Sequence, residues 1–146
     1  MNKSSLSFPA KNQRGQSLVE LALSMMVILM LLAGAINFGV GFFSYVAIRD
    51  AAQEGALYGS IDPTGNIEGR VRSSSARPVD LADTTAVQVN ISIQGSACAG
   101  GNPPNLLTVV VTYDCPVTMP LAGIFIGDHI TLTASATSTI LKPECP

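Results

Sequence analysis

The most constraining feature of the sequence is a stretch of 28 consecutive residues without a formal charge, between Glu20 and Arg49. At a rise of about 1.5 Å per residue, a helix needs only about 20 residues to cross a hydrocarbon layer roughly 30 Å thick. The first part of the stretch, LALSMMVILMLLAGAI, is apolar on all sides. The sequence therefore predicts a helix that spans a membrane and continues beyond it.

The continuation, INFGVGFFSYVAIRDAAQEGALYG, becomes progressively two-faced. Charged and amide side chains occupy one side, while small or apolar residues recur at the spacing of one helical stripe: Tyr45, Ile48, Ala52, Gly55, Ala56 and Gly59. We predict one long helix over residues 16–59, with its first half in lipid and its second half lying on a domain outside the membrane.

The charge distribution orients this helix. Residues 1–19 hold three cations and no acid, whereas residues 49–146 hold five cations and nine acids. A basic flank before an apolar run follows the positive-inside rule, so we expect a cytoplasmic N-terminus and an exported C-terminal part. The mildly acidic balance of the whole chain argues against a nucleic-acid partner.

Residues 60–146 predict a small antiparallel sheet. After a polar connection with one short helix around residues 67–75, three stretches alternate between apolar and polar residues: AVQVNISIQ, LLTVVVTYD and HITLTASAT. Three strands need a cover for their apolar face, and the second half of the long helix, rich in Ala and Gly, can supply it. The predicted fold class is α+β, a long helix packed on a small antiparallel sheet, with the open sheet edges and the loop 95–105 as contact surfaces.

Three cysteines, Cys98, Cys115 and Cys145, follow the membrane segment and permit one disulfide and one free thiol. In a meander of three strands, Cys98 and Cys145 follow the ends of the first and third strands, while Cys115 lies at the opposite end of the sheet. We therefore predict a disulfide between Cys98 and Cys145.

The N-terminal pattern has three interpretations. A secretory signal peptide with cleavage after Ala35 would leave the mature chain starting at Ile36, but Glu20 would then interrupt the edge of its apolar core. A capping box formed by Ser17 and Glu20 explains the local helix start, but not the glycine or the basic leader. The third interpretation joins the leader, Gly15, Glu20 and the apolar helix, and it resembles the processing site of type IV pilins and pseudopilins.

In such proteins a prepilin peptidase cuts after the glycine, and the helix stays on the mature chain. Cleavage between Gly15 and Gln16 would create a new α-amine on Gln16. The resemblance implies that this amine approaches Glu20 of a neighbouring subunit. Such a pairing would set subunit register rather than add net stability.

RGQSLVELAL, followed some thirty residues later by RDAAQEGALYG, resembles the TadE-like family of the tight-adherence pilus system. The resemblance covers roughly residues 14–59. This chain departs from the family pattern at Leu21, Met26, Gln53 and Leu57. The departures leave Gly15 and Glu20 in place, so processing and anchoring carry over best.

The resemblance implies a single-pass, bitopic protein of the bacterial inner membrane that helps to assemble a tight-adherence pilus. Its partners would be the membrane, a prepilin peptidase and other pilus subunits or platform proteins, with homo- or hetero-oligomers forming through the N-terminal helix. Two alternatives stay open: an uncleaved, membrane-tethered binding module, and the main filament subunit.

No catalytic or cofactor-binding motif is present in the sequence. The single histidine, His129, lacks the spacing of a metal site and is expected in a surface turn. Asp80 and Asp83 lack the glycine and oxygen spacing of a calcium loop. We therefore expect neither an enzyme, nor a metal site, nor a cofactor.

Overall fold

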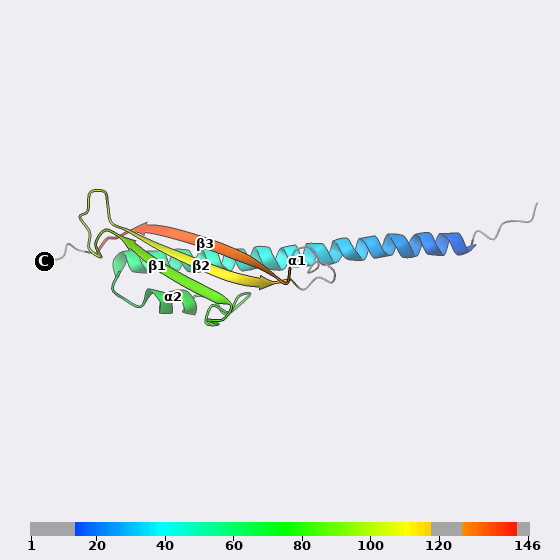
Figure 1. Cartoon of the computed structure of the whole chain (residues 1–146), viewed down its shortest axis with the longest axis horizontal. Coiled ribbons are helices and arrows are strands. Elements are labelled where there is room, and N and C mark those ends of the chain that lie inside the picture. Colours follow the sequence, from blue (N-terminus) through cyan, green and yellow to red (C-terminus); the bar gives the residue numbers. More distant parts are fainter. Residues whose placement is uncertain (1–13, 118–126, 143–146) are drawn as a thin grey trace, which may run out of the picture. The chain divides into compact units, whose positions relative to one another are not determined.

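The computed structural model describes residues 14–117 and 127–142. The chain divides into two compact units, Met1–Ala35 and Ile36–Pro146, which are treated separately below. Its elements are helix α1 (Arg14–Ile61), helix α2 (Ile67–Ser73) and strands β1 (Val87–Gln94), β2 (Leu106–Pro116) and β3 (His129–Thr139) (Figure 1). The α+β fold class predicted from the sequence is confirmed.

The first unit contains the beginning of α1, which starts at Arg14, two residues before the predicted start. Large apolar side chains surround the helix on every side, and those from Leu18 to Leu32 are 55–70% exposed. In water this exposure would oppose folding, because each such side chain gains about 1.5–3 kcal/mol on burial. The surface of this helix is therefore suited to an apolar surrounding.

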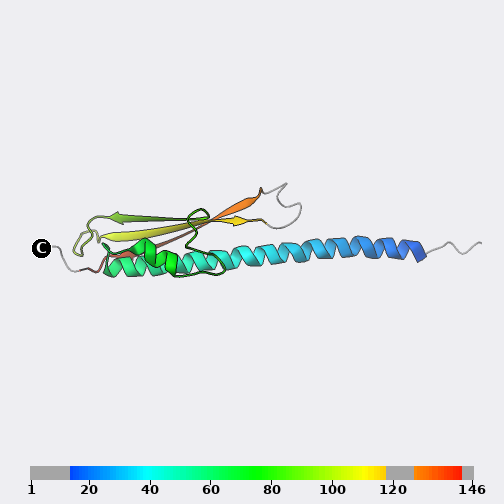
Figure 2. The same ribbon diagram turned by 90° about the horizontal axis from the view of Figure 1, so that it is seen from below.

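The second unit begins with the second half of α1, residues 36–61, which lies along one face of the sheet (Figure 2). Its buried stripe consists of Ser44, Ile48, Ala51, Ala52, Gly55, Ala56, Gly59 and Ser60. The predicted stripe is confirmed from Ile48 onward, but it was wrong at Tyr45, which is 40% exposed. The neighbouring Ser44 is buried instead, because the end of β2 at Cys115 comes within hydrogen-bonding reach of its hydroxyl.

Small residues let the helix approach the sheet closely. A Cβ atom added to Gly55 would collide with Val71 of α2 and lie 3.4 Å from Val109 of β2. A Cβ atom on Gly59 would lie 2.8 Å from Leu107 of β2. Because Gly59 meets Leu107, Gly55 meets Val109 and Ser44 meets Cys115, β2 runs antiparallel to α1.

The three strands form an antiparallel meander in the order β1-β2-β3. Val109 of the central strand pairs with Ile91 of β1 and Ala136 of β3, which places the apolar residues of all three strands on one face. The opposite face is polar and uncharged over most of its area. On that face the hydroxyl groups of Thr108 and Thr137 lie 2.9 Å apart.

The core lies between the sheet, the second half of α1 and α2. Ile48, Leu81, Leu107, Val109 and Val111 are each fully buried in it. The expectation that residues 60–85 form only a surface connection was wrong for four apolar residues that belong to this core: Ile67, Val71, Val79 and Leu81.

Candidate functional site

The segment expected to be processed forms the first turns of α1. Gly15 and Gln16 follow directly on Arg14, and the space around the Cα atom of Gly15 is open, since an added Cβ would meet no atom within 4 Å. Ser17 lies three residues inside the helix, so it is not the N-cap of α1 in the uncut chain. A cap at Ser17 remains a prediction for a chain that begins at Gln16, because cleavage would remove the preceding helical residues.

Glu20 is exposed on α1, and its backbone carbonyl accepts a hydrogen bond of 2.9 Å from the Ser24 hydroxyl. The ion pairs found among the described residues join Arg70 to Glu54 and Arg72 to Glu68, and Glu20 takes part in neither. Its carboxylate is followed by the uncharged stretch of the helix. It is therefore available to a charged group from outside the described part of the chain.

From Gly15 to Ile61, α1 is long and apolar enough to cross a membrane. Its most apolar window of 18 residues has a mean hydropathy of 2.4, and none of that window is buried. A core helix of a soluble protein would bury most of such a surface. The predicted spanning helix is thus supported by both length and exposure.

The end of the sheet opposite Ser44 is organised by Asn105. Its buried side chain donates from Nδ2 to the backbone carbonyl of Cys98, and the backbone carbonyl of Asn105 accepts from the N–H of Ile140 at 3.0 Å. Ala99 N–H donates to the carbonyl of Lys142 at 2.8 Å, which joins the loop 95–105 to the C-terminal segment. Gly95, with φ of +90°, turns out of β1 where a Cβ would collide with the Asn105 side chain.

The cysteines fit this arrangement only in part. Cys115 is a free, buried thiol, whereas Cys98 is not free. Cys145 lies outside the described residues, so the Cys98–Cys145 disulfide stays a prediction. Burial raises the pKa of the Cys115 thiol, and a hydrogen bond with Ser44 offsets part of that rise. Cys115 lies at the Ser44 end of the sheet, and Cys98 lies in the loop at the opposite end. This arrangement agrees with the predicted meander.

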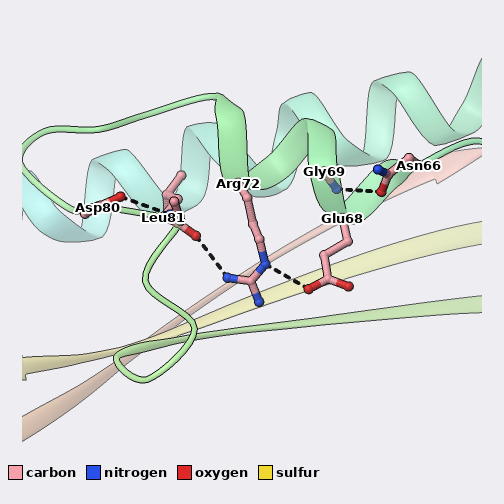
Figure 3. Close-up of polar contacts among 7 residues, drawn as sticks. Asn66, Glu68, Gly69, Arg72, Asp80 and Leu81 are labelled. Atoms are coloured by element: carbon pink, nitrogen blue, oxygen red, sulfur yellow. Dashed lines mark hydrogen bonds and ion pairs between the residues drawn. The ribbon is translucent and has the colours of Figure 1, made fainter.

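A network around α2 holds the connection between α2 and β1 (Figure 3). Arg72 donates from Nε to Glu68 at 2.8 Å and from Nη1 to the carbonyl of Leu81 at 3.0 Å. Asn66 caps α2 by accepting from the N–H of Gly69 at 2.8 Å. These contacts fix the fully buried Leu81 in the core.

An open groove of about 300 Å³ lies beside this connection. Helix α1 contributes Phe43, Val46, Ala47, Asp50, Ala51 and Glu54, and the connection contributes Ser74, Ser75, Arg77 and Pro78. This groove was not predicted from the sequence. The apolar residues Val79 and Leu81 within the polar connection were the available signal that this segment folds back onto the helix.

The potential metal ligands of the described residues are dispersed. Among the described residues, no three His, Cys, Asp or Glu side chains lie together in a way that could hold a metal ion. Asp80 and Asp83 instead accept hydrogen bonds from the backbone N–H groups of Ala82 and Thr85. The Thr85 hydroxyl and N–H hold the pKa of Asp83 below its ordinary value. His129 is exposed at the start of β3.

The geometry therefore presents an exposed apolar helix, with one acid near its start, joined to a sheet domain. Residues 15–57 match the family model described as TadE-like protein. The resemblance inferred from the sequence is thereby confirmed over the helix. No curated protein and no solved structure matches the chain.

The TadE-like segment covers Gly15 and Glu20, the exposed apolar surface and most of the helical stripe that packs on the sheet. The match ends within α1, so α2 and the three strands lie outside it.

Proposed function

We propose that this chain is a pseudopilin-like structural component for assembly of a tight-adherence pilus. It is anchored by the first part of α1 and cut by a prepilin peptidase between Gly15 and Gln16. The observation that carries the proposal is the coincidence of the TadE-like match with a helix whose apolar side chains are exposed on all sides. Such a helix can pass from a bilayer into a bundle of like helices without burial in its own domain.

The geometry of α1 supports a role for Glu20 in this assembly. An ionised carboxylate costs about 2.5–3.5 kcal/mol at the centre of a membrane helix and less near its edge, and a nearby cation lowers that cost. The new α-amine of Gln16 in a neighbouring subunit would be such a cation. Because the pairing is possible only at one axial offset between helices, it sets register.

The orientation follows from charge. The cations of residues 1–19 stay in the cytoplasm, and the sheet domain is exported. The TadE-like segment then serves as both anchor and assembly helix. Other pilus subunits or platform proteins are its partners.

N-terminal sequencing of the protein recovered from membranes tests the processing step. We expect Gln16 at the N-terminus, and its loss in a strain without the prepilin peptidase. Gly15→Val should abolish cleavage, whereas Gly39→Val, a matched change where an added side chain also meets no atom within 4 Å, should leave it intact. An intact Met1 would favour a tethered binding module, and Ile36 would indicate a secreted protein.

Glu20→Gln tests the register role separately from processing. We expect cleavage to continue while incorporation into the assembled complex falls at least about tenfold, which corresponds to about 1.4 kcal/mol. The control is Glu68→Gln, which removes a carboxylate from α2 without touching α1. Unchanged incorporation of the Glu20→Gln protein would refute the register role.

A further inference from the structure

Strand β1 is an open edge whose unpaired backbone groups can be identified from the register. Asp114 of β2 donates its N–H to the carbonyl of Ala86, so residues 86 and 114 form a hydrogen-bonded pair. Such pairs alternate along an antiparallel ladder. The N–H and C=O groups of Val89, Ile91 and Ile93 therefore point away from β2. Val87 fits this pattern, because its N–H donates outward to Asp83.

The same residues leave apolar surface uncovered. Ile91 is 37% exposed and Ile93 is 39% exposed, although both lie on the face that is buried in the central strand. No charged residue or proline interrupts β1. Natural edge strands are commonly protected from pairing by such residues, by bulges or by a covering segment. The stretch from Val89 to Ile93 is thus built to accept another strand.

Strand β3 is the other edge and presents different residues. Ile140 donates its N–H to the backbone carbonyl of Asn105, and Val117 donates its N–H to that of Asp128. The same alternation therefore leaves five hydroxyl-bearing residues of β3, in addition to His129, with outward backbone groups. They are Thr131, Thr133, Ser135, Thr137 and Thr139. All five are exposed, and β3 contains no Asp, Glu, Lys or Arg.

The partner follows from the symmetry of a membrane-anchored subunit, and this step rests on the proposed function. Strands β1 and β3 run parallel to residues 36–61 of α1, and in every copy the chain enters these residues directly from the membrane segment. Antiparallel pairing of two β1 edges would turn one copy upside down. Parallel pairing of two β1 edges would set the apolar face of one sheet beside the polar face of the other. Only pairing of unlike edges, β1 with β3, preserves both direction and face.

We propose that the β1 edge of one copy, from Val89 to Ile93, pairs in parallel with the β3 edge, from Thr131 to Thr139, of a second copy. The contact is heterologous, so it joins successive subunits rather than closing a two-fold dimer. It continues the sheet from one exported domain to the next. The helices fix the subunits in the membrane, and the strands fix the domains outside it.

Cysteine cross-linking between two differently tagged full-length copies in one membrane tests this pairing. One copy carries Asn90→Cys, and the other carries Thr133→Cys, Ser135→Cys or Thr137→Cys in turn. All four positions are exposed or partly exposed and lie on the polar face. Oxidation should link the two tags in at least one combination. Ile91→Cys, on the opposite face, should link to the same β3 positions at least about fivefold less, since neighbouring side chains meet only on one face.

The backbone contact is tested by Ile91→Pro in the Asn90→Cys copy. Proline removes an N–H that β2 does not use, and edge strands tolerate it at such positions. Loss of one backbone hydrogen bond, about 1 kcal/mol, should lower the cross-linked yield about fivefold. Ile91→Thr keeps the N–H and the β-branched shape, so its yield should fall less than about twofold. Protection of buried Cys115 from alkylation shows that each variant is folded.

The outcomes separate this proposal from the proposed function. A cross-link between β1 and β3 that Ile91→Pro reduces supports edge pairing. Links between two Asn90→Cys copies, or no link in membranes where the protein is embedded and begins at Gln16, would overturn edge pairing and leave the proposed function intact. A protein that is not embedded, or that begins at another residue, would overturn the proposed function and the edge pairing with it.

Discussion

Two arginines of α2 that look alike in the sequence have different surroundings. Arg72 is 19% exposed at its side chain and bonds both Glu68 and the carbonyl of Leu81, whereas Arg70, 54% exposed, pairs only with the surface carboxylate of Glu54. An exposed ion pair contributes about 0–1 kcal/mol. A hydrogen bond from a charged group that holds a buried segment contributes about 1.5–3 kcal/mol.

We therefore expect Arg72→Gln to lower the free energy of unfolding of the sheet domain by about 1.5–3 kcal/mol, and Arg70→Gln to lower it by less than about 1 kcal/mol. Urea unfolding of the full-length protein in detergent, followed by the rate at which Cys115 becomes available to alkylation, measures both. Equal effects of the two substitutions would show that the bond to Leu81 does not hold the connection.

The burial of apolar residues in this region was not predicted from the sequence. Val79 and Leu81 lie in a segment dominated by Ser, Asp and Thr, with neither a two-residue nor a helical period around them, so only their apolar character, and no periodic pattern, indicated burial. Their burial depends on the path of the chain after α2. The bond from Arg72 to the Leu81 carbonyl helps to fix that path, and the Asn66 cap helps to fix the start of α2. Ser44 was missed for a related reason, since its burial depends on the end of β2.

At the scale of the elements, α1 and the three strands were predictable because their periods are long and regular. Each strand was located to within two residues at each end, and the meander order was also expected. The helix start was misplaced by two residues because it was set at the expected cleavage site after Gly15, while the uncut chain continues the helix back to Arg14. The sequence could not predict which residues of β1 and β3 have outward backbone groups, because this depends on which pairs in the ladder are hydrogen-bonded.

The packing of α1 on the sheet predicts a reversal of the usual effect of replacing glycine in a helix. Alanine favours a helix over glycine by about 1 kcal/mol where space is free. At Gly55 an added methyl group collides with Val71, whereas at Gly41 it meets no atom within 4 Å. We expect Gly55→Ala to destabilise the sheet domain by about 1–3 kcal/mol.

Gly41→Ala serves as the matched control and should be neutral or slightly stabilising. The Gly55→Ala and Gly41→Ala proteins are compared in detergent by thermal unfolding, with near-ultraviolet circular dichroism reporting on the tyrosines of the sheet domain. Stabilisation by Gly55→Ala would mean that the helix and α2 are packed less closely than the structure shows.

At the scale of the whole molecule, the cysteines predict how the sheet domain responds to oxidation and pH. A peptide map under non-reducing conditions should show Cys98 linked to Cys145 and Cys115 as a free thiol. Removal of the link by Cys145→Ser should lower stability by roughly 3–4 kcal/mol, since it closes a long loop. A bridge that contains Cys115 would overturn the predicted pairing.

The buried thiol also predicts a pH dependence. Burial raises the pKa of Cys115 in the folded domain, so the unfolded chain loses this proton at a lower pH than the folded one. The contribution to stability is fully present below the unfolded pKa, about 9, and is lost as the pH rises through the folded value. Native protein at pH 8 should therefore react slowly with iodoacetamide at Cys115. The Cys115→Ala protein should lose less stability between pH 8 and pH 10 than the unsubstituted one.

The direction of the strands has a mechanical consequence. Strand β3 runs alongside residues 36–61 and ends where the N–H of Leu141 bonds the carbonyl of Ser60, at the end of α1. Tension between the start of this helix segment and the C-terminal segment would slide neighbouring elements past one another in shear. Many backbone bonds would then share the load at once instead of breaking in succession, so the sheet domain is built to stay folded while residues 36–61 are pulled.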